Sequence, residues 1–160
     1  MSADLLSWLR SVIEGDKAAA IAADKASPGP WVNRGQAGEG SAWQIHGALT
    51  DDSETEWDEE RQDVVNIGIR VATLNYSDGG GVWEREAADH IVLQQPRDTI
   101  ARCTAELALL DEHPEAAGTY LPNWAGRCQG CGERTPCTTV KLLASGRRHR
   151  PGFNPEWVSE

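Results

Sequence analysis

Three cysteines near the C-terminus carry the clearest chemical signal in this 160-residue sequence. Two residues separate Cys128 from Cys131, and Cys137 follows six positions later, after a turn that contains Gly130 and Gly132. A Cys-x-x-Cys pair on a glycine-rich turn points two thiolates at one place, and a third cysteine with one further donor completes a tetrahedral metal site. The spacing therefore predicts a metal centre in this segment.

Several residues are candidates for the fourth ligand of this centre. His113 is expected at the last turn of a helix, where it can bind a metal or interact with the carbonyl groups that end the helix. His149 lies in the tail that follows the cysteines. Cys103 falls on the apolar stripe of a helix, where a cysteine is usually a small buried hydrophobic residue. His46 and His90 are further candidates.

A long amphipathic helix is expected at the N-terminus. Its apolar residues recur at the three-and-four spacing of one helical face: Leu5, Leu6, Leu9, Val12 and Ile13. The alanine-rich residues 18–23 extend it. Residues 27–31, Ser-Pro-Gly-Pro-Trp, end it because proline lacks an N–H group and disfavours a helical residue before it.

A second long helix is expected to start after Pro96, with Asp98 as its cap, and to run to about Glu112. Its apolar stripe consists of Ile100, Cys103, Leu107 and Leu110. A short helix over residues 138–144 follows the cysteines, and the extended tail after it carries two aromatic residues that we expect to dock on the rest of the chain.

The middle of the chain is typical of β-structure. Residues 43–46 and 64–76 alternate between the two faces of a strand, the second run most clearly. Residues 77–81 predict a turn, with a hairpin return into 82–84. Residues 51–60 hold seven carboxylates, and this density of charge predicts a solvated loop.

The net charge of −10 is divided unevenly. Residues 1–120 hold 9 basic and 22 acidic side chains, whereas residues 121–160 hold 6 basic and 3 acidic ones. The acidic part would repel a phosphate backbone, which argues against nucleic-acid binding by most of the surface. We expect the basic tail to contact acidic groups of its own chain or of a partner. No membrane span or signal peptide is recognisable, so a cytoplasmic location with reduced thiols is expected.

Several motifs resemble those of a family of short proteins of unknown function encoded by actinobacteria and their phages. They are residues 4–9 (DLLSWL), 27–31 (SPGPW), 89–91 (DHI), 109–113 (LLDEH), the Cys-x-x-Cys-Gly turn, 136–144 (PCTTVKLLA), 151–153 (PGF) and 156–157 (EW). The resemblance implies that His113 belongs with Cys128, Cys131 and Cys137, and it implies no activity. The family tail usually reads His-Pro-Gly-Tyr, so His149 is displaced by one residue here and is a weaker candidate.

We therefore predict a zinc site formed by His113, Cys128, Cys131 and Cys137, because thiolates and imidazole are the preferred tetrahedral donors of zinc. The alternative is an iron–sulfur cluster. The cysteine spacing, with Cys103 upstream, also resembles that of WhiB-like iron–sulfur regulators, and four thiolates favour such a cluster. The Gly-Val-Trp turn that follows the cysteines in those regulators precedes them here.

The fold class that these elements predict is α+β: a small antiparallel sheet packed by two long helices, with a C-terminal segment like a zinc knuckle. We expect an α+β body over residues 1–112 and a metal-binding segment over residues 113–160 that packs on this body.

No catalytic motif is recognisable: the sequence lacks a nucleophile elbow, a phosphate-binding glycine loop and a His-Glu-x-x-His helix. Glu133 and the pair Asp89–His90 are weak acid–base candidates. The leading hypothesis is a non-enzymatic, zinc-stabilised interaction protein of phage or mobile-element type that binds a host or phage protein. The alternative is a metal-dependent regulator that contacts DNA through a basic tail containing Arg147, Arg148 and Arg150.

Overall fold

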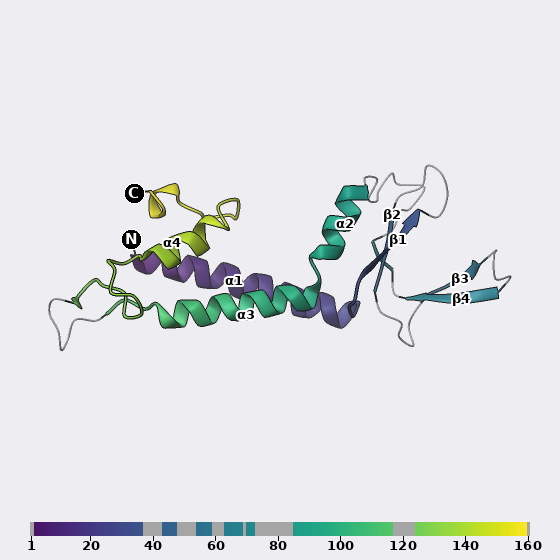
Figure 1. Cartoon of the computed structure of the whole chain (residues 1–160), viewed down its shortest axis with the longest axis horizontal. Helices are drawn as coiled ribbons and strands as arrows, with labels where there is room; N and C mark the ends of the chain where they lie inside the picture. The colour runs from purple at the N-terminus through teal and green to yellow at the C-terminus, as the bar shows by residue number, and fades with distance from the viewer. Residues whose placement is uncertain are drawn as a thin grey trace. The chain divides into compact units, whose positions relative to one another are not determined.

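The computed structural model describes residues 2–36, 43–47, 54–58, 63–68, 70–72, 85–116 and 124–159 (Figure 1). The chain forms two compact units: Met1–Ala18 together with Ile100–Glu160, and Ala19–Thr99. The division between them falls inside helix α1 (Ser2–Ala26) and inside helix α3 (Pro96–Glu112). The sequence-based division into a body over residues 1–112 and a metal-binding segment over residues 113–160 stays a prediction.

The predicted helices are confirmed. Helix α1 ends where the Ser27 N–H donates to the Ala23 carbonyl, and helix α4 covers Thr138–Ser145. Helix α3 begins with Pro96, a residue that suits the first helical position because no N–H is needed there. Asp98 therefore lies inside the first turn and is not the cap that we expected. None of the helices in the described ranges is long and apolar enough to cross a membrane.

The first unit has a core to which both ends of the chain contribute. Its buried residues come from α1, α3, the cysteine segment and α4: Leu5, Leu9, Ile13, Cys103, Leu110, Cys128, Cys137, Val140 and Ala144. Trp8 stacks at an angle against Phe153 and Trp157, and its Nε1 donates to the Pro151 carbonyl at 2.9 Å. The aromatic residues of the tail thus dock on α1, as the sequence predicted.

The described residues of the second unit form two small antiparallel sheets. Strands β1 (Val32–Gln36), β2 (Trp43–His46) and β5 (Arg70–Ala72) pair in the order β1-β2-β5. Strands β3 (Glu54–Asp58) and β4 (Asp63–Gly68) form a separate hairpin. Helix α2 (Arg85–Leu93), which the sequence analysis did not anticipate, packs against β1 and β2. The predicted α+β class is confirmed.

Two expectations about the strands were wrong. The expected strand over residues 64–76 is divided, because β4 pairs with β3 whereas β5 pairs with β2. The expected loop over residues 51–60 contains β3. Acidic residues alternate with Thr55 and Trp57 along this strand, and such a period of two is compatible with pairing despite the charge. Three expected features lie outside the described residues: the last part of the strand at 73–76, the turn at 77–81 and the return at 82–84.

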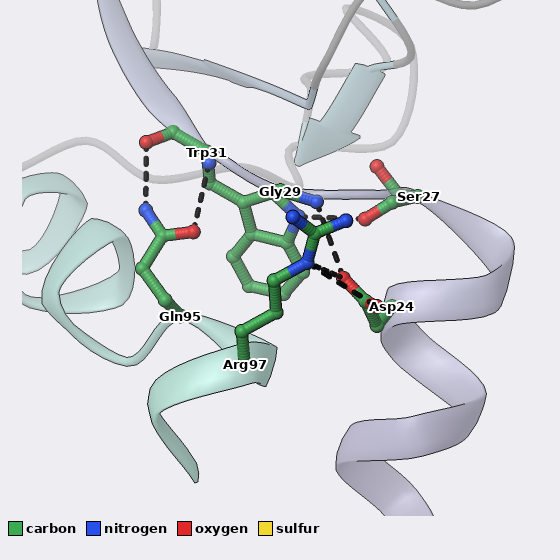
Figure 2. Close-up of polar contacts among 6 residues, drawn as sticks. All are labelled: Asp24, Ser27, Gly29, Trp31, Gln95 and Arg97. Carbon is green, nitrogen blue, oxygen red and sulfur yellow. Dashed lines mark hydrogen bonds and ion pairs between the residues drawn. The ribbon is translucent and has the colours of Figure 1, made fainter. Parts of the chain in front are cut away.

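The Ser-Pro-Gly-Pro-Trp segment is held by the residue that precedes α3 (Figure 2). The Trp31 N–H donates to Gln95 Oε1 at 2.8 Å, and Gln95 Nε2 donates to the Trp31 carbonyl at 2.8 Å. One side-chain amide thereby satisfies both backbone groups of Trp31. The Trp31 indole Nε1 donates back to the Ser27 carbonyl at 2.9 Å.

Asp24 fixes the same segment from α1 (Figure 2). Its Oδ1 accepts from the Gly29 N–H at 3.3 Å and from Arg97 Nε at 3.1 Å. The carboxylate therefore connects the turn at Gly29 with Arg97 in the first turn of α3. The Ser-Pro-Gly-Pro-Trp segment thus has a structural role in joining α1 to α3.

Replacing Gln95 with alanine should lower the free energy of unfolding by about 1–3 kcal/mol, because both backbone groups of Trp31 lose their partner in a partly buried position. The measurement is the shift of the urea unfolding midpoint. Gln94→Ala is the matched control, since Gln94 is exposed, and it should change the midpoint little. Equal effects of the two substitutions would contradict this role of Gln95.

Candidate metal centre

Four side chains converge at the C-terminal side of α3. The Sγ atoms of Cys128, Cys131 and Cys137 and one ring nitrogen of His113 lie within 4.8 Å of one another. His113 Nδ1 is 3.2 Å from Cys128 Sγ and 3.6 Å from Cys137 Sγ. Tetrahedral bonds of about 2.3 Å to sulfur and 2.0 Å to nitrogen would place ligand atoms roughly 3.5–3.8 Å apart. The four residues are thus close enough to hold a metal ion.

His113 reaches the cysteines because a short backbone pairing follows α3. Glu115 forms an antiparallel bridge with Cys128, and the Ala116 N–H donates to the Arg127 carbonyl at 2.7 Å. The Gln129 N–H donates to the Pro114 carbonyl at 2.9 Å. These bonds place the residues directly after His113 beside the first cysteine, although the two lie 15 positions apart.

The Cys-x-x-Cys segment forms a tight turn. The Cys128 N–H donates to the Glu133 carbonyl at 2.8 Å, and the Gly132 N–H donates to the Cys128 carbonyl at 2.9 Å. Gly132 has φ +75°, a conformation that favours glycine. The turn therefore brings the sulfur atoms of Cys128 and Cys131 to one side.

Gly130 permits the close approach of this turn to α3. A Cβ atom at this position would lie 2.2 Å from the Glu112 carbonyl oxygen and 3.3 Å from His113 Nδ1. The first distance is far inside van der Waals contact with a backbone atom, so any other residue would push the turn away from His113. The sequence analysis noted this glycine only as part of a turn.

Cys137 is positioned by the start of α4, where it is the residue that precedes the first helical turn. Glu133 supports this helix end, since its Oε2 accepts from the Thr138 N–H at 2.8 Å. This hydrogen bond lowers the pKa of the exposed Glu133 carboxyl. Glu133, considered above as an acid–base candidate, therefore serves as a helix cap.

The three thiols differ in environment and in pKa. Burial raises the pKa of Cys128, but hydrogen bonds from the backbone and thiol of Cys131 and from His113 outweigh it and bring this pKa down to about 7. Burial raises the pKa of Cys137 to about 11, and the neighbouring Cys128 adds to the rise. Cys131 is exposed. Because a metal binds thiolates, a divalent ion entering this site must release protons from it.

The other ligand candidates lie in different surroundings. Cys103 is fully buried in the apolar core of the first unit, and burial raises the pKa of its thiol. His149 is exposed, and its Nε2 accepts from Arg148 Nε at 3.2 Å. His46 is buried on β2, and His90 is exposed on α2. The group of four contains none of these residues and includes His113, whose role as a ligand stays a prediction.

The basic tail pairs with acidic residues of its own chain, one of the two arrangements that its charge predicted. Arg147 forms an ion pair with Glu106, and Arg150 forms one with Asp16. The side chain of Arg147 is only 11% exposed. Two of the three arginines considered for DNA contact are therefore engaged within the first unit.

The model of a family described as "Family of unknown function (DUF6221)" matches residues 2–159. No curated protein and no solved structure matches the chain.

Replacing Gly130 with alanine should weaken metal binding by at least about tenfold, because the added methyl group meets the Glu112 carbonyl and separates the turn from His113. Competition with a chromogenic chelator measures this affinity. Gln129→Ala is the matched control in the same turn: its side chain is exposed, and its backbone bond to Pro114 remains. An unchanged affinity in Gly130→Ala would show that this close approach is not required.

Proposed function

We propose that this chain, which belongs to that family of unknown function, is a non-enzymatic, zinc-stabilised interaction protein of phage or mobile-element type that binds a host or phage protein. The observation that carries the proposal is the set of one histidine and three cysteines whose ligand atoms lie within 4.8 Å of one another. The resemblance of the motifs to actinophage proteins supports the biological setting.

Zinc is the metal that this donor set suits best. Three thiolates and one imidazole form a closed tetrahedral set, and closed sets of this kind hold structural zinc. The burial of Cys103 in the core supports zinc over an iron–sulfur cluster with four cysteine ligands. Bound zinc would cross-link the end of α3, the cysteine turn and the start of α4, with about 10–16 kcal/mol of apparent binding free energy.

A structural role is supported by the surroundings of the site. Cys128 and Cys137 belong to the same buried cluster as Leu5 and Leu9 of α1. A bound metal ion would therefore stabilise the packing of this core. Zinc catalysis needs an open coordination position with an acid or base beside it. Four protein ligands leave no open position, and the nearby Glu133 carboxylate is engaged at the start of α4.

Protein purified without added metal should contain one zinc ion per chain and should be colourless. His113→Ala should lower zinc affinity more than about 100-fold, since even residues behind the ligands contribute 10–100-fold. His149→Ala is the matched control and should leave the affinity unchanged. Elemental analysis and chelator competition provide the measurements. A brown sample that contains iron and sulfide, or equal losses in both variants, would contradict the assignment.

The interaction role is tested by affinity capture with the immobilised, zinc-loaded chain. A protein partner should be retained in stoichiometric amount from lysate of the host. The same partner, once purified, should bind at least about tenfold more weakly to His113→Ala, because this variant lacks one of the four residues proposed to hold zinc. His149→Ala should retain the partner fully. Recovery of no stoichiometric partner, or equal binding by His113→Ala, would contradict a zinc-dependent interaction role.

A further inference from the structure

A half-open cavity of about 440 Å³ lies in the first unit, away from the four metal-ligand candidates. Its volume falls within the range of small-molecule sites, about 300–1,000 Å³. The charged and polar residues that line it come from α1, α3 and the turn after α4: Asp16, Arg102, Glu106, Arg147, His149 and Arg150. The proposed zinc function uses none of these residues.

The lining carries positive charge on a strongly acidic protein. Its three arginines face only two carboxylates, whereas the whole chain has a net charge of −10. The carboxylates do not engage all the arginine donors. Arg147 Nη2 pairs with Glu106, but Arg147 Nε is 3.8 Å from Asp16 Oδ2, which is too long for a hydrogen bond. A local positive site on an acidic surface favours an anionic ligand.

Three groups around the cavity have donor capacity left. The Arg147 Nε atom is buried and makes no hydrogen bond in the described part of the chain. A buried donor without an acceptor is unfavourable, which shows that the neighbouring carboxylates do not saturate this guanidinium group. Arg102 is exposed, and its guanidinium group makes no hydrogen bond or ion pair with a side chain or backbone group of the described residues. His149 Nε2 accepts from Arg148 Nε, which leaves Nδ1 as the ring nitrogen available to a ligand.

We propose that this cavity binds a small phosphate monoester with an apolar body. Arginine pairs with oxyanions in bidentate fashion, and the three terminal oxygens of a phosphate use more of the available donors than the two of a carboxylate. Leu142 and Leu143 of α4 line the same cavity, and Leu142 is 67% exposed. These leucines provide the surface against which the apolar body of the ligand packs.

Isothermal titration of the full chain in phosphate-free buffer tests the proposal, with phenyl phosphate as the probe. Phenyl phosphate should bind saturably, and it should bind more tightly than inorganic phosphate, which lacks the apolar body, and than benzoate, which lacks the third oxygen. Arg102→Gln should weaken phenyl phosphate binding by about tenfold or more, since a hydrogen bond between charged groups is lost. Because Arg102 is exposed, we expect this variant to fold like the unchanged chain, and circular dichroism checks its fold.

Lys25→Gln is the control for the loss of one positive charge, because Lys25 is exposed at the end of α1 and does not line the cavity. It should leave the affinity for phenyl phosphate unchanged. Absence of saturable binding would overturn the site. Benzoate that binds as tightly as phenyl phosphate would overturn the phosphate assignment, and equal effects of Arg102→Gln and Lys25→Gln would overturn the location. Zinc content is measured separately, so these outcomes do not depend on the metal assignment.

Discussion

The backbone pairing between the residues after α3 and those around Cys128 is the constraint on which the first unit depends. It consists of one antiparallel bridge, formed by two hydrogen bonds, yet it places His113 beside the cysteine turn and the turn beside α3. Hydrogen bonds of this kind contribute only about 1 kcal/mol each. A bound zinc ion would contribute about 10–16 kcal/mol, which is comparable to the whole stability of a typical domain at about 5–15 kcal/mol. The backbone thus sets the geometry, and a metal would supply most of the strength.

Core packing and the geometry of the candidate metal site are coupled in this unit, because two cysteines belong to both the core and the site. Cys128 and Cys137 are buried among the apolar residues of α1, α3 and α4, while Cys131 is exposed. A change in the core would therefore move two candidate ligands, and a change at the site would disturb the core. The angled stacking of Trp8 with Phe153 and Trp157 also joins α1 to the tail. Because the tail follows α4, this contact helps to hold the C-terminal end of α4 against α1.

Periodicity and spacing were sufficient to predict the parts of the molecule whose signal is local. The apolar stripes of α1 and α3 and the spacing of the cysteines follow from neighbouring residues, and the structure has them where they were expected. The pairing of β5 with β2 depends on non-local contacts, which the sequence pattern does not reveal. The charge of residues 54–58 concealed the alternation along β3, so its hairpin with β4 was not predicted. Helix α2 was missed because its short run ends in Ile91, Val92 and Leu93, two of which are β-branched and favour strands. The choice of His113 as the candidate for the fourth ligand depended on family resemblance, since no spacing rule connects it to the cysteines.

The arrangement of the units along the chain has a consequence for synthesis on the ribosome. The first unit combines Met1–Ala18 with Ile100–Glu160, and the second consists of the residues between them. During translation, Leu5 and Leu9 leave the ribosome long before the cysteines and α4 that bury them. The second unit can become compact first, while the apolar face of α1 waits for its partners. A nascent chain therefore exposes the apolar face of α1 until α3, the cysteines and α4 have been synthesised. Transiently exposed apolar surface of this kind favours aggregation.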